Sequence, residues 1–270
     1  MQDPEAFFHL GPKKTGSTYL QQNIFPRLRG IEYYGKGDLK KYKKILDAGT
    51  QTKYLFSREF DESLEGRMRG IAADVPQAKI ILVLRRQDSW LASKYKYHIK
   101  KYGGLEFKEF FDLESDTGFC KKEELCFRTK IEWVESLFEN KPLILIFDDL
   151  KNHPDMFIKQ MTDFLGVEID DNAKINKVVK KAFSDKQLNV LKKINRSHPY
   201  VRMNTGFKLL NRLHYKFRGF FLYAVAYLVP FIPRQWLGDD VLMEPEELEK
   251  IREFYQADWE YCKQYSRPVA

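Results

Sequence analysis

The stretch that decides the fold is Phe7–Gln21, which reads FFHLGPKKTGSTYLQ. It begins with an apolar run typical of a buried strand, passes through a loop that contains Gly11 and Gly16, and ends in an amphipathic segment. A strand, a glycine loop and a helix in this order can bind a phosphate, because backbone N–H groups and the positive end of the helix dipole converge on an anion. The two glycines have the spacing of G-x-x-x-x-G-K-[ST], but Ser17 stands where that pattern needs lysine, and the basic residues come earlier, at Lys13 and Lys14.

Composition excludes a disordered chain and favours an anionic ligand. The 270 residues are 43% apolar and 15% aromatic, and the formal net charge is +8. A basic surplus suits an anionic substrate, nucleic acid or a membrane surface. The lysines are spread along the chain instead of forming one block, which argues against nucleic acid.

The cysteines and histidines predict neither a disulfide framework nor a metal site. Cys120, Cys126 and Cys262 form no C-x-x-C pair, and the five histidines are scattered. The odd cysteine count and the lack of a secretory leader indicate a cytoplasmic protein.

Strand-like and helix-like segments alternate, which predicts an α/β fold: a three-layer sandwich with a central parallel sheet and helices on both faces. Expected strands are Ala6–Leu10, Ile31–Tyr34, Tyr54–Ser57, Lys79–Leu84 and Pro142–Phe147. Expected helices are Lys122–Asn140, Asp155–Leu165, which has Pro154 at its start and Gly166 after its end, and a closing helix from Glu244 to Tyr265. We expect a single domain over residues 1–270, with a core at 1–170 and a helical, acceptor-binding part at 171–270.

The segment Gly219–Ile232 is nearly as apolar as a membrane span, but it is too short to cross a bilayer and Pro230 interrupts it. A buried helix is the favoured interpretation. The alternative is peripheral contact with a membrane, because Lys216, Arg218 and Arg234 flank the segment.

A second group of chemically active residues lies in Leu82–Tyr97, LVLRRQDSWLASKYKY. Arg85 and Arg86 follow a buried strand, at the edge where open α/β sheets bind ligands. The helix that follows starts near Asp88 and carries Ser93. An arginine with a helix-borne serine can hold a second phosphate through charge-assisted hydrogen bonds.

Together these motifs resemble the sulfotransferases that use 3′-phosphoadenosine 5′-phosphosulfate. The family's 5′-phosphosulfate loop, G-x-x-K-[ST]-G-[ST]-[ST], matches GPKKTGST from Gly11 to Thr18. Its 3′-phosphate motif, an arginine after a strand and a serine eight positions later, matches Arg85 and Ser93. A third stretch, Phe147–Gly166, resembles the family's "YEDL…P…FLG" segment.

The resemblance implies a role for each matching residue. Lys13 belongs to the donor loop, and Lys14 would neutralise charge on the bridging oxygen as the sulfuryl group leaves. The 5′-phosphate would be held by Thr15, Gly16, Ser17 and Thr18, and the 3′-phosphate by Arg85 and Ser93. The product would be 3′-phosphoadenosine 5′-phosphate, and no metal is implied.

The acceptor side is less defined. The reaction needs a base for the acceptor hydroxyl, and S-x-E after a short strand makes Glu59 the first choice, with Glu32 and His98 in reserve. The family's C-terminal R-K-G loop is missing; Asn176, Ser184, Arg196 and Arg202 lie where substitutes could come from. The acceptor could be a small molecule, a carbohydrate or a lipid, and the oligomeric state cannot be predicted.

Two other functions stay open. A magnesium-dependent nucleotide kinase with an unusual loop could use Asp148 or Asp149 after the strand LILIF. A non-catalytic, membrane-associated binding protein could keep the same fold and use Gly219–Ile232 for its contact.

Overall fold

The computed structural model describes residues 4–35, 37–59, 64–101, 103–170, 183–199, 204–233 and 241–266. The chain divides into two compact units, which we describe separately. Unit 1 comprises residues 1–87, 126–178 and 255–270, and unit 2 comprises residues 88–125 and 179–254. Whether the two act as a single sulfotransferase domain, as the sequence suggests, stays a prediction.

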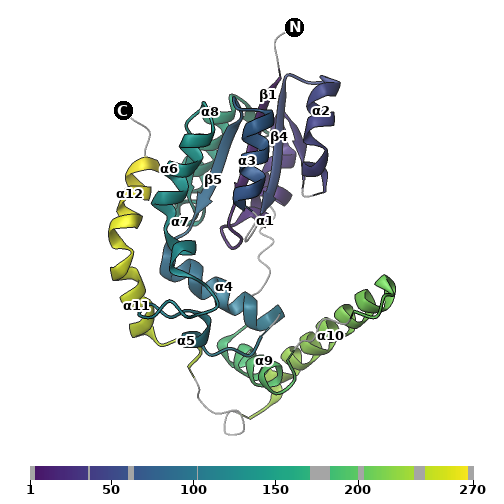
Figure 1. The fold of residues 1–270 in the computed structure, drawn as a ribbon, viewed down its shortest axis with the longest axis vertical. Coiled ribbons are helices and arrows are strands. Elements are labelled where there is room, and N and C mark those ends of the chain that lie inside the picture. Colours follow the sequence, from purple (N-terminus) through teal and green to yellow (C-terminus); the bar gives the residue numbers. More distant parts are fainter. Residues whose placement is uncertain are drawn as a thin grey trace. The chain divides into compact units, whose positions relative to one another are not determined.

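Unit 1 is built on a parallel sheet of five strands in the order β3-β4-β1-β5-β6 (Figure 1). The strands of this sheet are β1 (Glu5–Gly11), β3 (Glu32–Tyr34), β4 (Lys53–Glu59), β5 (Lys79–Leu84) and β6 (Leu143–Ile146). All five expected strands are confirmed within one or two residues. A separate antiparallel pair joins β2 (Leu28–Arg29) to β7 (Glu168–Ile169).

Helices cover both faces of this sheet, which confirms the predicted three layers. Since side chains alternate along a strand, Phe7 faces a core shared with Phe157 and Met161 of α8, whereas Phe8 contacts Tyr42 of α2. The helical elements of unit 1 are α1 (Ser17–Tyr19), the π-helix η1 (Leu20–Ile24), η2 (Phe25–Arg27), η3 (Asp38–Lys41), α2 (Tyr42–Ala48), α3 (Leu64–Asp74), α6 (Phe127–Leu137), α7 (Phe147–Asn152), α8 (Pro154–Leu165) and α12 (Gln256–Ser266).

The regular secondary structure of unit 2 is entirely helical in its described residues. It contains α4 (Gln87–Lys101, of which Gln87 belongs to unit 1), α5 (Phe107–Phe110), η4 (Lys122–Leu125), α9 (Asp185–Ser197), α10 (Lys208–Leu228), η5 (Val229–Phe231) and α11 (Pro245–Phe254). Buried polar contacts hold these helices together. Asn195 of α9 donates from Nδ2 to the Ile99 carbonyl of α4 at 2.7 Å.

Three expectations differ from the structure. The α-helical part of the expected helix Lys122–Asn140 is only α6 (Phe127–Leu137), which follows the 3-10 turn η4 (Lys122–Leu125). The closing helix is two helices, α11 and α12, which are separated at Tyr255. The segment Gly219–Ile232 is not a buried helix: only Leu222, Ala226 and Val229 are buried, while its aromatic side chains are exposed. Apolar composition alone does not reveal whether another element covers a helix.

Candidate active site

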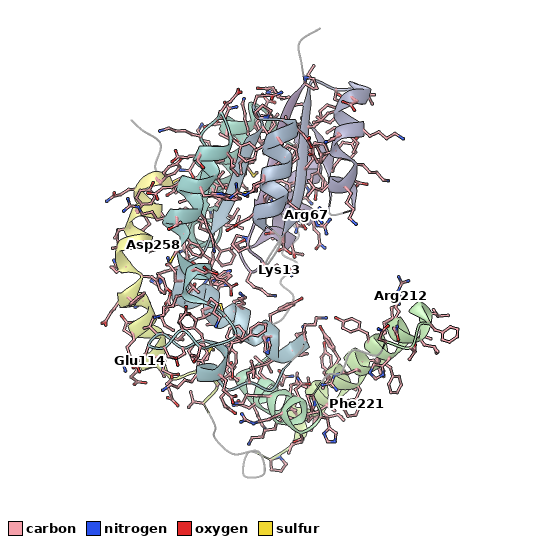
Figure 2. All side chains as sticks on the ribbon, in the orientation of Figure 1. Lys13, Arg67, Glu114, Arg212, Phe221 and Asp258 are labelled. Carbon is pink, nitrogen blue, oxygen red and sulfur yellow. The ribbon has the colours of Figure 1, made fainter. Side chains whose placement is uncertain are left out.

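The loop between β1 and α1 contains the predicted donor-binding residues at the carboxyl end of the central strand (Figure 2, where Lys13 is labelled). Lys14 has φ 74° and Gly16 has φ 84°, so the backbone enters the left-handed region twice within three residues. Left-handed turns of this kind are a component of the anion-binding concavities that backbone N–H groups form. The sequence folds this way because Gly16 has no Cβ to oppose that conformation.

The hydroxyl groups of the loop have distinct environments. Thr15 is buried and donates from Oγ1 to the Pro12 carbonyl at 2.9 Å, so its side chain braces the loop. Ser17 is also buried, with its Oγ 3.4 Å from the Thr15 hydroxyl. Thr18 is exposed at the helix start. Of the three hydroxyls, that of Thr18 is the most accessible to an anion.

Phe147 of α7 links the donor loop to Arg85. A Cβ added to Gly16 would lie 3.0 Å from the Phe147 ring and 3.1 Å from Leu150, so the loop packs tightly against α7. The Arg85 guanidinium lies over the same ring, 4.8 Å from its centre. Arg85 also donates from Nη1 to the Lys14 carbonyl at 3.4 Å. Phe147, from the third sequence motif, therefore contacts both the donor loop and the arginine that follows β5.

Arg85 and Ser93 fall in different units. Arg85 follows β5 directly, and Ser93 lies on α4. The helix forms where the sequence predicts it, with Asp88 in its first turn. The joint role of Arg85 and Ser93 at a 3′-phosphate stays a prediction.

Among the three candidate bases, Glu59 lies at the same sheet edge as the donor loop. It is the last residue of β4 and pairs in register with Gly11. Glu32 pairs with Tyr54, the partner of Ala6, so it lies five residues, or roughly 16 Å, back along the sheet from Gly11. Its carboxylate accepts a hydrogen bond from the Tyr34 hydroxyl at 2.7 Å. The register therefore favours Glu59 over Glu32.

His98 lies in unit 2, buried against the rings of Phe110 and Phe119. Burial and the nearby charge of Lys94 lower its pKa. These contacts give His98 a packing role within that unit.

Two of the candidates for the rest of the nucleotide clamp have structural partners. Ser184 caps α9 in a capping box with Gln187. Arg196 makes ion pairs with Glu106 and Glu109, each at 3.2 Å. The other two candidates, Asn176 and Arg202, lie outside the described residues.

A buried polar cluster beneath the loop was not predicted from the sequence. His9 of β1 lies with Nδ1 2.7 Å from the Ser57 hydroxyl of β4, and Gln21 of the π-helix donates to the same hydroxyl at 2.9 Å. Full burial lowers the pKa of His9 to about 4, so the ring is neutral at pH 7. The cluster joins both sides of the donor loop to β4. A histidine inside an otherwise apolar strand was the available signal, since such a ring needs a polar partner.

The family model described as "Sulfotransferase domain" matches residues 71–208, just over half of the chain. The chain belongs to the sulfotransferase domain family. It is therefore a transferase whose co-substrate is the family's donor, 3′-phosphoadenosine 5′-phosphosulfate. The match includes Arg85, Ser93 and the Phe147–Gly166 segment, whereas the Gly11–Thr18 loop lies before it.

A solved structure of a sulfotransferase from Alicyclobacillus acidocaldarius shows the same fold, with a TM-score of 0.51 and 16% identity over 72% of this chain and 93% of that one. Mouse sulfotransferase SULT7A1 complexed with PAP gives a TM-score of 0.43 at 17% identity, over 70% of this chain and 67% of its own. The sulfotransferase domain of the Synechococcus PCC 7002 olefin synthase gives a TM-score of 0.39 at 12% identity, over 95% of this chain and 96% of its own. No curated protein was found to match the chain.

Proposed function

We propose that this sulfotransferase binds the 5′ end of its donor in the Gly11–Thr18 loop and transfers the sulfuryl group to a hydroxyl of a small-molecule, carbohydrate or lipid acceptor. The observation that carries the proposal is the contact between the loop and Arg85. Arg85 donates to the Lys14 carbonyl at 3.4 Å, so its guanidinium lies against the backbone of the loop that contains Lys13 and Lys14. Three positive charges at one sheet edge suit a ligand with several negative charges.

The residues at this edge fit such a donor. The left-handed positions Lys14 and Gly16 shape the loop, and the tight contact of Gly16 with Phe147 fixes its position on α7. When bound, the donor supplies the sulfuryl group and a leaving phosphate oxygen on which negative charge develops. The Lys14 ammonium would stabilise that charge, and backbone N–H groups from Thr15 to Thr18 would hold the 5′-phosphate.

Glu59 is the proposed general base. Its place opposite Gly11 supports this role, because a carboxylate at the loop edge can take the proton of an acceptor hydroxyl while Lys14 stabilises the leaving side. Arg85 and Ser93 are proposed to hold the 3′-phosphate. We assign the choice of acceptor to residues 171–270.

We further propose a cytoplasmic location. Cys120, Cys126 and Cys262 form no disulfide in the described residues, which is usual in a reducing compartment. Contact with a membrane through residues 219–232 would be peripheral, because no helix in the described part of the chain is long and apolar enough to cross a bilayer.

Transfer of ³⁵S-sulfate from the labelled donor tests this function. The assay would contain EDTA and a panel of phenols, sugars and lipid alcohols, with wild type, Lys14→Ala and the exposed control Lys40→Ala compared on the same acceptor. We expect metal-independent transfer that Lys14→Ala abolishes and Lys40→Ala preserves. Magnesium-dependent phosphoryl transfer from ATP, with no sulfuryl transfer to any acceptor, would contradict the proposal in favour of the kinase.

A further inference from the structure

The outer face of α10 carries a stripe of exposed apolar side chains. The stripe comprises Leu209, Leu213, Phe217, Phe220, Phe221 and Tyr227. Spacings of three, four and seven residues keep these side chains on one face of a helix with about 3.6 residues per turn. Phe217 is 74% exposed, Phe220 73% and Leu209 68%. Such a long apolar surface is costly in water and indicates an interaction site.

Contacts inside unit 2 fix which face of α10 points outward. Leu222, Ala226 and Val229 are buried and lie on the side of the helix opposite the stripe. Arg218 donates from Nη2 to Asn195 Oδ1 of α9 at 2.6 Å, and Gln187 of α9 donates to the Ala226 carbonyl at 2.8 Å. The carboxyl-terminal half of α10 is thereby anchored on α9, and the helix extends beyond it (Figure 2, from Phe221 to Arg212).

The charged residues of the sequence that includes α10 have one sign. Residues 186–238 contain no aspartate or glutamate, although they contain ten lysines and arginines. Arg212 and Lys216 lie on α10 itself, four residues apart along one edge of the stripe, and both are exposed. A helix with an apolar face bordered by cations is the pattern that binds in the interface of an anionic membrane, where aliphatic and aromatic side chains enter the acyl boundary and the cations meet lipid phosphates.

We propose that α10 docks unit 2 onto the surface of a bilayer that contains anionic lipids, with the stripe inserted at the headgroup level. The helix would lie on the membrane, because no helix among the described residues is suited to span one. A second copy of the chain is a poorer occupant. A two-fold contact through this face would pair two copies of a helix that has four cations and no carboxylate, so no acidic side chain of α10 would neutralise the positive charge at the contact.

Co-sedimentation with vesicles tests the proposal on the full chain. Phosphatidylcholine vesicles would be compared with vesicles containing about one third phosphatidylserine. The variants are Phe217→Ser with Phe220→Ser, which removes the centre of the stripe, and Arg212→Glu with Lys216→Glu, which reverses its charges. Matched controls are Met156→Ser, an exposed apolar residue of α8, and Lys40→Glu with Lys44→Glu, which changes net charge equally at exposed sites.

We expect binding to the anionic vesicles that weakens with salt and falls at least about tenfold in each α10 variant, while both controls bind as wild type does. If the phenylalanine variant unfolds, the charge variant alone decides, since its residues are exposed. Equal binding to neutral and anionic vesicles, or α10 variants that bind like the controls, would overturn the proposal. Self-association that the α10 substitutions abolish, without vesicle binding, would overturn it in favour of a second copy.

Discussion

Replacement of Gly16 by alanine perturbs the donor loop at the point where it packs on α7. Gly16 has φ 84°, a conformation that costs an L-residue about 1–2 kcal/mol. The new Cβ would also lie 3.0 Å from the Phe147 ring and 3.1 Å from Leu150. Relieving an overpacked contact of this kind costs about 1–3 kcal/mol. The total is therefore about 2–5 kcal/mol.

We expect most of this cost to appear in donor affinity, because the loop can move away from α7 more easily than the core can rearrange. A loss of about 2 kcal/mol raises Kd about thirtyfold. Titration calorimetry with 3′-phosphoadenosine 5′-phosphate measures this change, and a thermal melt of the same variant measures any loss of stability.

Gly30→Ala is the matched control. Gly30 has φ 77°, so alanine there meets the same backbone strain, but nothing lies within 4 Å of the added Cβ. It should lose stability and keep nucleotide affinity. Unchanged affinity and stability in Gly16→Ala, or an equal loss of affinity in Gly30→Ala, would refute the argument that contact with Phe147 positions the loop.

Four further predictions address individual side chains. Lys14→Ala should lower kcat about a hundredfold or more while nucleotide Kd changes little; steady-state kinetics with calorimetry checks this, and retained turnover would remove Lys14 from its role. Arg85→Ala should weaken binding of 3′-phosphoadenosine 5′-phosphate by about 2–3 kcal/mol, since a charge-assisted contact is lost; an unaltered Kd would exclude Arg85 from the site. Glu59→Gln should reduce transfer by about a hundredfold or more with Kd intact, and normal transfer rates would move the base elsewhere. The neutral His9 has a pKa near 4 against an ordinary value of 6.5, so below pH 6.5 the unfolded chain binds a proton that the folded chain does not. The contribution of His9 to the free energy of unfolding is therefore complete above pH 6.5 and is smaller by about 3 kcal/mol at pH 4. Urea unfolding at a series of pH values should show this dependence on pH in wild type and a weaker one in His9→Gln.

The sheet could be predicted strand by strand because its physical signal is local. Parallel strands that are covered on both faces consist of nearly unbroken apolar runs. The run in Lys79–Leu84 predicts a strand with the same bounds as β5. The bounds of α8 follow from Pro154 in its first turn and from Gly166, whose φ of 60° ends the helix.

Features that depend on which segments meet in space could not be predicted. The register that places Glu59 beside Gly11 requires β4 to neighbour β1, and strand order is not encoded locally. The hydrogen bond between His9 and Ser57 depends on the same pairing across 48 residues. The motif around Phe147 was recognised, but its contacts with Gly16 and Arg85 become evident only in three dimensions. The exposure of α10 depends on what covers the helix, which apolar composition does not specify.

Calorimetric titration with 3′-phosphoadenosine 5′-phosphate in the presence of EDTA, with ATP as the comparison ligand, tests the central claim most directly. The donor loop formed by Gly11–Thr18 and Arg85 predicts metal-independent binding at least about tenfold tighter than that of ATP, which corresponds to about 1.4 kcal/mol. No binding, or a preference for ATP with magnesium, would contradict the assignment of this loop to the sulfotransferase donor.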